Sequence, residues 1–157
     1  MDQIRPCFNF IAKGDKSYMI NSFITAEQTV ATGNNILFNF DRVRTKSSQG
    51  CCGWLSHENG SGTFILTKPG IYQINFNCNV ENVGDATTPI ILDVTNSGEN
   101  IQGAKMVANP PSGQEQNVCC SLLINNACGT SSIISIENNS GNDVIINDAN
   151  IVITRWC

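Results

Sequence analysis

The stretch Gly62-Thr-Phe-Ile-Leu-Thr-Lys-Pro-Gly-Ile-Tyr-Gln-Ile-Asn-Phe-Asn-Cys-Asn-Val80 decides the fold of this 157-residue chain. From Tyr72 to Val80 the even positions are apolar, whereas the odd positions carry uncharged amides. Side chains alternate between the two faces of a strand, so this pattern predicts a β-strand with one buried face and one polar face. Lys68-Pro69-Gly70 predicts a tight turn before it, because Pro presets φ at one corner and Gly accepts a positive φ at the next.

The rest of the chain repeats this arrangement of short apolar runs separated by turn residues. No segment has helical periodicity, and closely spaced strands of this kind indicate an all-β, antiparallel two-sheet sandwich. We expect a single domain, with residues 1–29 as an N-terminal segment holding the first strand or strands and residues 30–157 as the body of the sandwich. Besides the quoted stretch, the expected strands cover residues 8–12, 18–25, 36–40, 90–95, 101–107, 118–124, 132–137 and 144–156.

Phe64 and Leu66, followed by Pro69-Gly70-Ile71-Tyr72-x-Ile74-x-Phe76, resemble the paired strands of the tumour-necrosis-factor-like jelly-roll superfamily. That superfamily includes the globular heads of complement and the collagen-like proteins of bacterial spore surfaces. Residues 90–101 resemble its next hairpin, and residues 122–129 and 149–155 resemble its last strands. The resemblance extends over roughly residues 30–156, and it implies a jelly roll that assembles as a trimer.

The resemblance also implies which residues meet a sister protomer. In this family, the strand that corresponds to residues 72–80 lines the contact between protomers with its non-core face. Carried over by position, Gln73, Asn75 and Asn77 would lie near the trimer axis, and Phe8 and Trp156 are candidate apolar anchors. A solvated sheet face is the alternative for these amides.

The charge of the chain argues against nucleic acid as a partner. The net charge is −4, the pI is about 4.8 and only 14% of the residues are charged. Arg42, Arg44 and Lys46 form one small basic cluster, which fits a solvated strand edge better than a phosphate-binding patch. A neutral polar surface does little to repel a copy of itself, which suits self-association, although codon drift in an AT-biased genome would produce the same composition.

No targeting segment is expected from the sequence. Residues 1–6 lack the apolar core of a secretory signal, and no run approaches the ~20 apolar residues that span a bilayer. We therefore expect synthesis in the cytoplasm and no membrane partner.

Eight cysteines are unusual for a reducing compartment and indicate late oxidation. The chain has no Cys-x-x-Cys pair and one histidine, which disfavours structural zinc. Neighbouring cysteines are too close for a relaxed disulfide, so the members of the vicinal pairs should find separate partners. We expect intermolecular disulfides from Cys7, Cys51, Cys52, Cys119 and Cys157, and buried or intrachain positions for Cys78, Cys120 and Cys128.

Nothing in the sequence resembles an active site. Ser56-His57-Glu58 has the residue types of a catalytic triad, but consecutive residues do not face one another, and we expect His57 to be an exposed turn residue. Asp93, Asp143 and Asp148 are scattered, so a calcium site built from loop carboxylates remains only an alternative. We expect no enzyme activity, no cofactor and no metal.

These observations favour a structural protein whose main partner is itself. The hypothesis is a cysteine cross-linked building block of a bacterial spore coat or exosporium, made in the mother cell, assembled through a trimer and joined to other spore-surface proteins. The alternative is an adhesin or phage-fibre-type head that recognises a glycan or a receptor.

Overall fold

The computed structural model describes residues 18–45 and 53–156, which form two antiparallel β-sheets and no helix. No helix in this part of the chain is long and apolar enough to cross a membrane. The strands are β1 (Tyr18–Phe23), β2 (Gln28–Val30), β3 (Phe40–Arg44), β4 (Leu55–Ser56), β5 (Phe64–Leu66), β6 (Gly70–Asn82), β7 (Ile90–Asn96), β8 (Glu99–Ala108), β9 (Gln116–Asn126), β10 (Ser132–Asn138) and β11 (Val144–Arg155).

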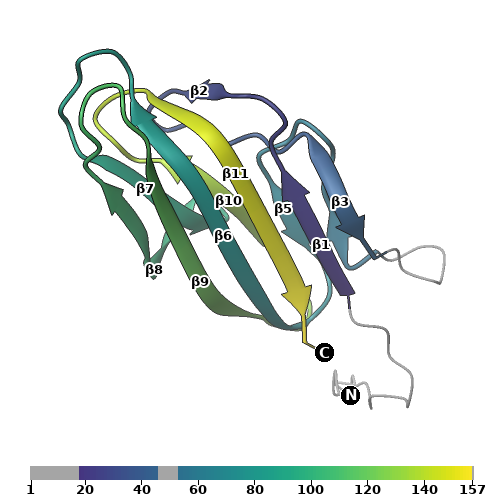
Figure 1. Ribbon diagram of the computed structural model, residues 1–157. Helices are drawn as coiled ribbons and strands as arrows, with labels where there is room; N and C mark the ends of the chain where they lie inside the picture. The colour runs from purple at the N-terminus through teal and green to yellow at the C-terminus, as the bar shows by residue number, and fades with distance from the viewer. Residues whose placement is uncertain (1–17, 46–52, 157) are drawn as a thin grey trace, which may run out of the picture.

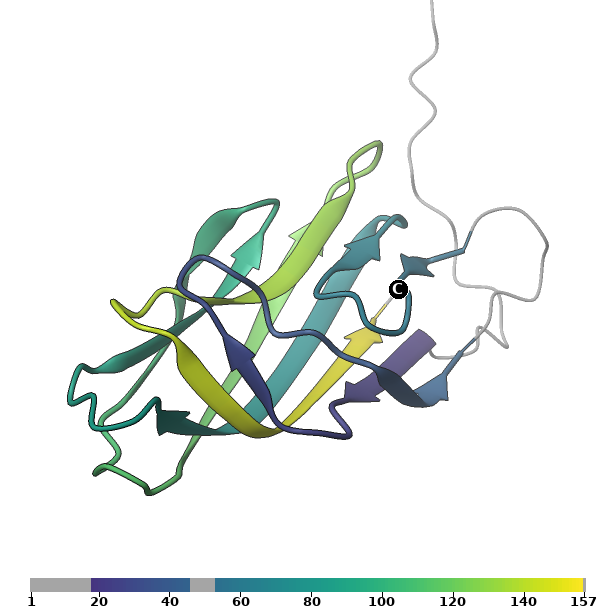
Figure 2. The ribbon, with the colours of Figure 1, turned by 90° about the horizontal axis from the view of Figure 1, so that it is seen from above.

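The two sheets stack face to face as a jelly-roll sandwich. The first, called the β6 sheet, has the strand order β3-β1-β11-β6-β9, with β2 also paired to β11. The second, called the β7 sheet, has the order β4-β5-β10-β7-β8. The β6 sheet lies in front in Figure 1, and Figure 2 shows the sandwich from above. This arrangement confirms the predicted all-β, two-sheet fold.

The long strand β6 has the alternation that its sequence predicts. Tyr72, Ile74, Phe76 and Val80 are fully or almost fully buried, and they face the interior of the sandwich. The odd residues between them face outward and are partly or fully exposed. Since β6 pairs with β11 and β9 over nearly its whole length, it fixes the register of the sheet that carries the candidate site.

Aromatic side chains fill the space between the sheets. The ring of Phe38 packs edge-on against Phe64 and Phe76, with centroid distances of 5.4 and 6.4 Å. The Trp54 ring stacks on Tyr72 at 6.2 Å, and the Tyr72 hydroxyl donates a hydrogen bond to Lys68 O. Such pairs add to the hydrophobic stabilisation that their burial provides.

The alternation of residues 36–40 predicts a strand, and this prediction is wrong in detail. The segment makes only isolated bridges, at Asn35 and Phe38, and strand β3 begins at Phe40. Ile36 and Phe38 are nevertheless fully buried. An extended loop that crosses the end of a sandwich gives the same alternation as a strand, because its side chains also point inward and outward in turn.

His57 is buried, which corrects the expectation of an exposed turn residue. Its ring stacks on Phe64 with a centroid distance of 4.0 Å, and its Nδ1 lies 2.8 Å from Thr63 O. The next residues form a tight turn that reaches Gly62, where a Cβ atom would lie 2.8 Å from the Asn35 Cβ. Packing against Phe64 and against Asp41 on β3, rather than the local sequence, encloses the imidazole.

Candidate protomer interface

The outward face of the β6 sheet brings together most of the residues expected at a protomer contact. Gln73 and Asn75 are partly buried and Asn77 is exposed, and all three lie on this face of β6. In the register of the sheet, Asn75 lies between Ser121 on β9 and Val152 on β11. Phe8 lies outside the described residues.

Amides on this face are joined by hydrogen bonds across the strands. Ser121 Oγ donates to Asn75 Oδ1 at 2.6 Å, and Asn117 Nδ2 donates to Asn79 Oδ1 at 2.8 Å. On the same face, but on the side of β6 away from β9, Asn21 Nδ2 donates to Asn150 Oδ1 at 2.6 Å. The result is a band of uncharged, ordered polar groups, whose loss of side-chain entropy on docking is reduced because the side chains are already held in place.

Two apolar patches flank the amide band. The first, called the β9 patch, consists of Leu123 and Ile71, which are 65% and 47% exposed. Trp156, 57% exposed, follows β11, and its backbone N–H donates to Ile71 O, so it lies beside this patch. The second, called the β3 patch, consists of Phe23, Phe40 and Val43.

The β3 patch contains the aromatic surface of this face. Phe23 and Phe40 are directly opposite in the β1–β3 pair, with ring centroids 5.2 Å apart, and Phe40 is 50% exposed. The Arg42 guanidinium lies 4.6 Å from the Phe23 ring centroid, a cation–π contact. Aromatic residues and arginine are the types that most often dominate binding energy in protein interfaces.

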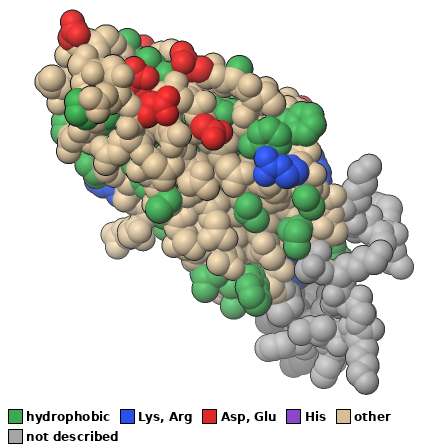
Figure 3. Space-filling model, in the orientation of Figure 1, with side chains coloured by type: hydrophobic (Ala, Val, Ile, Leu, Met, Phe, Trp, Pro, Cys, Tyr) green, Lys and Arg blue, Asp and Glu red, His purple; other side chains and the backbone are tan. Residues whose placement is uncertain are grey.

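Figure 3 shows this face in the orientation of Figure 1. Uncharged atoms cover its middle, hydrophobic side chains gather toward the lower and right-hand parts, and acidic groups gather at the upper left. The acidic end corresponds to the end of β6 and the start of β11, where Glu81 and Asp148 lie. A partner that covers the middle of the face therefore avoids the charged groups.

Strand β9 is an edge strand without the usual protection against pairing. Natural edge strands are typically short, bulged or charged. Strand β4 has 2 residues, β3 carries Asp41, Arg42 and Arg44 and contains a bulge, and β8 carries Glu99 and Lys105 and pairs through an irregular register. In contrast, the 11 residues of β9 include no charged side chain and no proline. Among the edge strands of the described residues, β9 is the long one that lacks these protections.

The cysteines lie on both sides of the β6 sheet. Cys119 is exposed on the outer face of β9, next to Asn77, whereas Cys78 is buried on the inner face. Cys120 is half-buried against the core, and burial followed by the neighbouring Cys119 raises the pKa of its thiol. Burial, and to a lesser extent Asp148, raises the pKa of Cys78 as well, far above the neutral range.

The remaining cysteines divide into one described residue and four others. Cys128 is exposed in the turn after β9 and is disulfide-bonded. Apart from Cys119, the cysteines expected to form intermolecular disulfides lie outside the described residues: Cys7, Cys51, Cys52 and Cys157. Nothing in the described part of the chain supports a disulfide between protomers.

Neither catalytic nor metal-binding groups converge on this face. In the described ranges 18–45 and 53–156, no three His, Cys, Asp or Glu side chains are placed to hold a metal ion. Ser56 and Glu58 are exposed while His57 is buried, so the three consecutive residues do not form a triad.

The sequence did not indicate the two apolar patches. Leu123 occupies an odd position of β9, out of phase with the inward residues Val118, Leu122 and Ile124. This difference in phase is the one feature of the sequence that could have indicated an outward-facing leucine. The β3 patch had no comparable signal, because the bulge in the β1–β3 pair changes which residues face outward.

Comparison with known proteins gives no family by sequence. No protein-family model matches the chain, and no curated protein sequence matches it.

Solved structures, in contrast, match over most of the chain. The globular domain of zebrafish complement 1qA protein aligns with a TM-score of 0.64 and 10% identity, covering 90% of this chain and 98% of that domain. Murine APRIL at pH 5.0 aligns with a TM-score of 0.62 and 10% identity, covering 90% and 100%. Eiger TNF from S. frugiperda aligns with a TM-score of 0.61 and 10% identity, covering 90% and 93%. The chain therefore has the jelly-roll fold of the tumour-necrosis-factor-like and complement globular heads.

Proposed function

We propose that this protein is a self-associating head whose protomers assemble as a trimer through the outward face of the β6 sheet. The observation that carries the proposal is the combination of an uncharged, partly apolar face with the unprotected edge strand β9. An exposed edge of this kind is a template for aggregation unless another surface covers it.

The two apolar patches suggest how the protomers meet. A two-fold contact uses the same patch on both partners, whereas a ring needs two different patches that complement each other. Leu123 on the β9 patch and Phe40 on the β3 patch lie at opposite edges of one face. Seating the β9 patch of one protomer on the β3 patch of the next uses both, and we take the ring to close at three subunits because the family resemblance implies that number.

The amide band then lies within the assembly. Gln73, Asn75 and Asn77 approach their counterparts near the axis, and they bond to one another or to trapped water, because an unpaired buried amide costs about 1–3 kcal/mol. Because this band carries no charge, identical copies can approach each other through it without the repulsion between like charges.

The location of the assembly is a separate part of the proposal. We place the protein in a bacterial spore coat or exosporium, where mother-cell lysis supplies late oxidation. The cysteine content and the family resemblance support this location. Cross-links would come from the exposed Cys119 and from Cys7, Cys51, Cys52 or Cys157.

Light scattering and non-reducing electrophoresis of the native protein test the two parts separately. A trimer at micromolar concentration in the presence of reductant supports assembly through the β6 sheet, and a monomer contradicts it. Covalent multimers that disappear with reductant support cross-linking. A reductant-insensitive trimer leaves the assembly standing and overturns the cross-linked layer.

A glycan-binding head is the second candidate function. The half-exposed Phe40 ring beside Phe23, with Arg42 next to it, is the kind of surface on which a sugar ring stacks and a carboxylate pairs. A glycan array that gives a specific hit, lost in Phe40→Ala, favours this function. If the trimer covers this surface, we expect no glycan on the array to bind to it.

A further inference from the structure

A hollow of about 270 Å³ lies against the β7–β8 hairpin, in the sheet behind the candidate protomer interface in Figure 1. Small-molecule sites in proteins usually occupy about 300–1,000 Å³, so this hollow suits a ligand of one small ring. Its lining comes from one residue of β7 and five of β8: Asp93, Asn100, Ile101, Gln102, Gly103 and Lys105.

An irregular stretch of β8 forms the hollow. Asp93 pairs with Lys105 and Thr95 pairs with Asn100, so β8 places four residues, 101–104, opposite the single residue Val94. The extra residues leave the regular ladder, as they do in a β-bulge. Gly103 has a φ of 83°, a left-handed conformation that glycine adopts without strain. The irregularity therefore exposes a part of β7 that a regular β8 would cover.

The Asp93 carboxylate borders this hollow although it is almost completely buried. Its neighbours Leu92 and Val94 are buried in the core, so alternation places Asp93 on the outer face, yet only 2% of it is exposed. Asn139, after β10, covers it, because its Nδ2 donates to Asp93 Oδ2 at 2.9 Å and to Asn100 Oδ1 at 3.2 Å. Among the described residues no group donates to Asp93 Oδ1, and this oxygen is not fully enclosed. Its lone pairs are therefore available to a ligand in the hollow.

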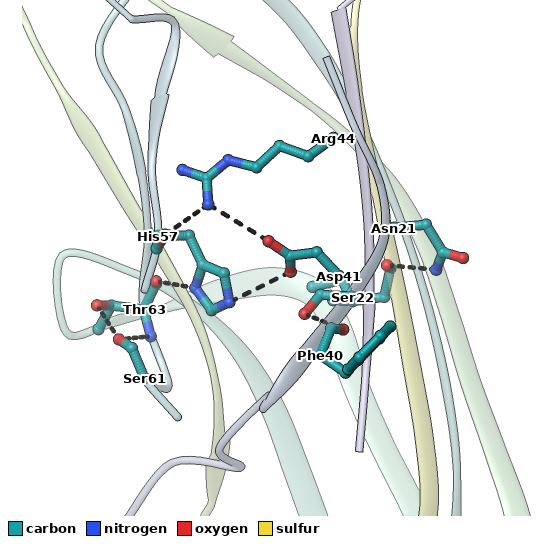
Figure 4. Close-up of polar contacts among 9 residues, drawn as sticks. Asn21, Ser22, Phe40, Asp41, Arg44, His57, Ser61 and Thr63 are labelled. Carbon is teal, nitrogen blue, oxygen red and sulfur yellow. Dashed lines mark hydrogen bonds and ion pairs between the residues drawn. The ribbon is translucent and has the colours of Figure 1, made fainter. Parts of the chain in front are cut away.

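Asp93 also lacks the counter-ion that a buried carboxylate normally has. Asp41 on β3, whose side chain is 14% exposed, has the Arg44 guanidinium 3.3 Å away (Figure 4). For Asp93, no Lys, Arg or His nitrogen of the described residues lies within 4.0 Å, although Lys105 is directly opposite in the ladder. On its other side Asp93 pairs with Glu137 of β10, a second acid. The protein itself thus leaves a strong acceptor unused at this place.

The charges around the hollow exclude several kinds of ligand. An anion would be repelled by Asp93 and by Glu137 beside it. A calcium or magnesium ion needs several oxygen ligands, but in the ranges 18–45 and 53–156 no three His, Cys, Asp or Glu side chains converge. Lys105 lines the same hollow and disfavours a metal ion or an ammonium group as the ligand. A neutral ligand remains.

A neutral ligand with several hydroxyl groups matches every polar group of the lining. A hydroxyl donates one hydrogen bond and accepts others. It can donate to the free oxygen of Asp93, a charge-assisted bond of the strong kind, and accept from the Lys105 ammonium. The amides of Asn100 and Gln102 offer both donors and acceptors, and the half-buried Ile101 offers an aliphatic surface to the C–H groups of a ring.

We propose that the hollow beside Asp93 binds one neutral sugar ring, whose hydroxyl groups donate to the carboxylate. This site is separate from the β3 patch and lies in the sheet that the proposed trimer leaves uncovered. A single ring should bind with a dissociation constant of about 1 mM. Three such sites on one trimer would bind a surface dense in that sugar about 10²–10⁴-fold more tightly, and this gain alone rests on the proposed function.

Nuclear magnetic resonance with free sugars tests the site directly. The probes are D-glucose, D-galactose, D-mannose and N-acetyl-D-glucosamine, each at up to about 10 mM, some tenfold above the expected dissociation constant, with a chelator present. We expect at least one sugar to give saturation transfer and saturable shifts of the backbone amides of residues 100–105. The proposal is overturned if no sugar binds, if the shifts fall only in the β3 patch, or if binding requires added calcium.

Two variants and a matched control assign the binding to this lining. Asp93→Asn keeps the shape of the side chain but removes its charge, and it should raise the dissociation constant at least about tenfold. Gln102→Ala changes an exposed residue and should raise it about threefold to tenfold, which keeps the test valid if Asp93→Asn does not fold. Glu99→Gln removes an exposed carboxylate of the same hairpin outside the lining, and it should change the constant by about twofold or less. Unchanged affinity in Asp93→Asn and Gln102→Ala, or an equal loss in Glu99→Gln, refutes the site.

The oligomeric state separates this site from the trimer. In Leu123→Lys, a substitution at the β9 patch, the free sugar should bind as in the wild type, whereas binding to a surface coated densely with that sugar should weaken. A monomeric wild type that binds the free sugar refutes the trimer and supports the site. A trimer to which none of the four sugars binds refutes the site and supports the trimer.

Discussion

The two edge strands of the β6 sheet differ in how well they are protected from pairing with another chain. Strand β3 has 5 residues, three of them charged, and it contains a bulge, so its edge is protected within the protomer. Strand β9 has 11 residues, none charged, and Leu123, the most exposed large hydrophobic side chain among residues 18–45 and 53–156, lies at its outer face. The contrast indicates that the edge of β3 is protected from pairing within the protomer, whereas the edge of β9 lacks such protection and would have to be covered by another molecule.

The largest expected effect comes from a charge on the β9 patch. Leu123→Lys should remove the trimer at micromolar concentration, because a buried lysine without a partner replaces an apolar contact three times in one ring. A loss of about 2–4 kcal/mol per contact, as at interface hot spots, raises the dissociation constant by about 30- to 700-fold for each contact. Light scattering measures the mass.

Val107→Lys is the matched control for this substitution. Val107 is 51% exposed on β8, at an edge of the other sheet, and is similar in exposure to the β9 patch. We expect its trimer to be intact and the folding stability of both variants to change by about 0.5 kcal/mol or less. Equal loss of mass in both variants would contradict the assignment of β9 as the covered edge.

The next effect concerns how β9 is anchored at its end. Asn126 is 2% exposed; the two N–H groups of its Nδ2 are shared among Leu66 O, Lys68 O and Thr130 O, and its Oδ1 accepts from Ser132 Oγ and Thr130 Oγ1. Asn126→Ala leaves these groups without their partner and should lower the free energy of unfolding by about 2–3 kcal/mol. Chemical denaturation measures it, and the exposed neighbour in Asn125→Ala should cost about 0.5 kcal/mol or less.

A smaller effect is expected at Gly62, where the turn after β4 closely approaches the loop at residues 35–37. A Cβ at position 62 would lie 2.8 Å from Asn35 Cβ and 3.0 Å from Ile36 O, so Gly62→Ala should destabilise by about 1–2 kcal/mol through overpacking. Gly141→Ala has its nearest contact at 3.8 Å and is the control. Equal melting temperatures in the two alanine variants would contradict the tight approach beside His57.

The sequence predicted the features that depend on one strand at a time. The alternation from Tyr72 to Val80 is local, and so the inward and outward residues of β6 were predicted correctly. The turn between the strands expected at residues 90–95 and 101–107 was also predicted, and the structure closes it at Ser97 and Gly98, which both adopt a positive φ.

Features that depend on how strands pair were not predictable in this way. The bulge at Arg42 leaves Val43 outside and brings Arg44 to the same side as Asp41, and nothing in the order of these residues indicates it. Burial of His57 likewise results from packing between the turn and β3, which are brought together by the fold. The sequence therefore predicted the β6 residues of the candidate interface, whereas the β9 and β3 patches are visible only in the structure.

The cysteines offer the finest test of the contrast, since Cys119 lies on the edge that we expect to be covered. Iodoacetamide at about pH 8 should alkylate Cys119 readily in Leu123→Lys, because the Cys119 thiol is exposed on the outer face of β9. Cys120 should react more slowly and Cys78 only after unfolding, because burial raises the pKa of both thiols. In the wild-type trimer Cys119 should also be protected, so mass spectrometry should find one adduct fewer among the described cysteines than in the variant. Equal labelling of Cys119 in both proteins would mean that β9 is open to solvent in the assembly, and the cover for this edge would then have to be sought in another partner.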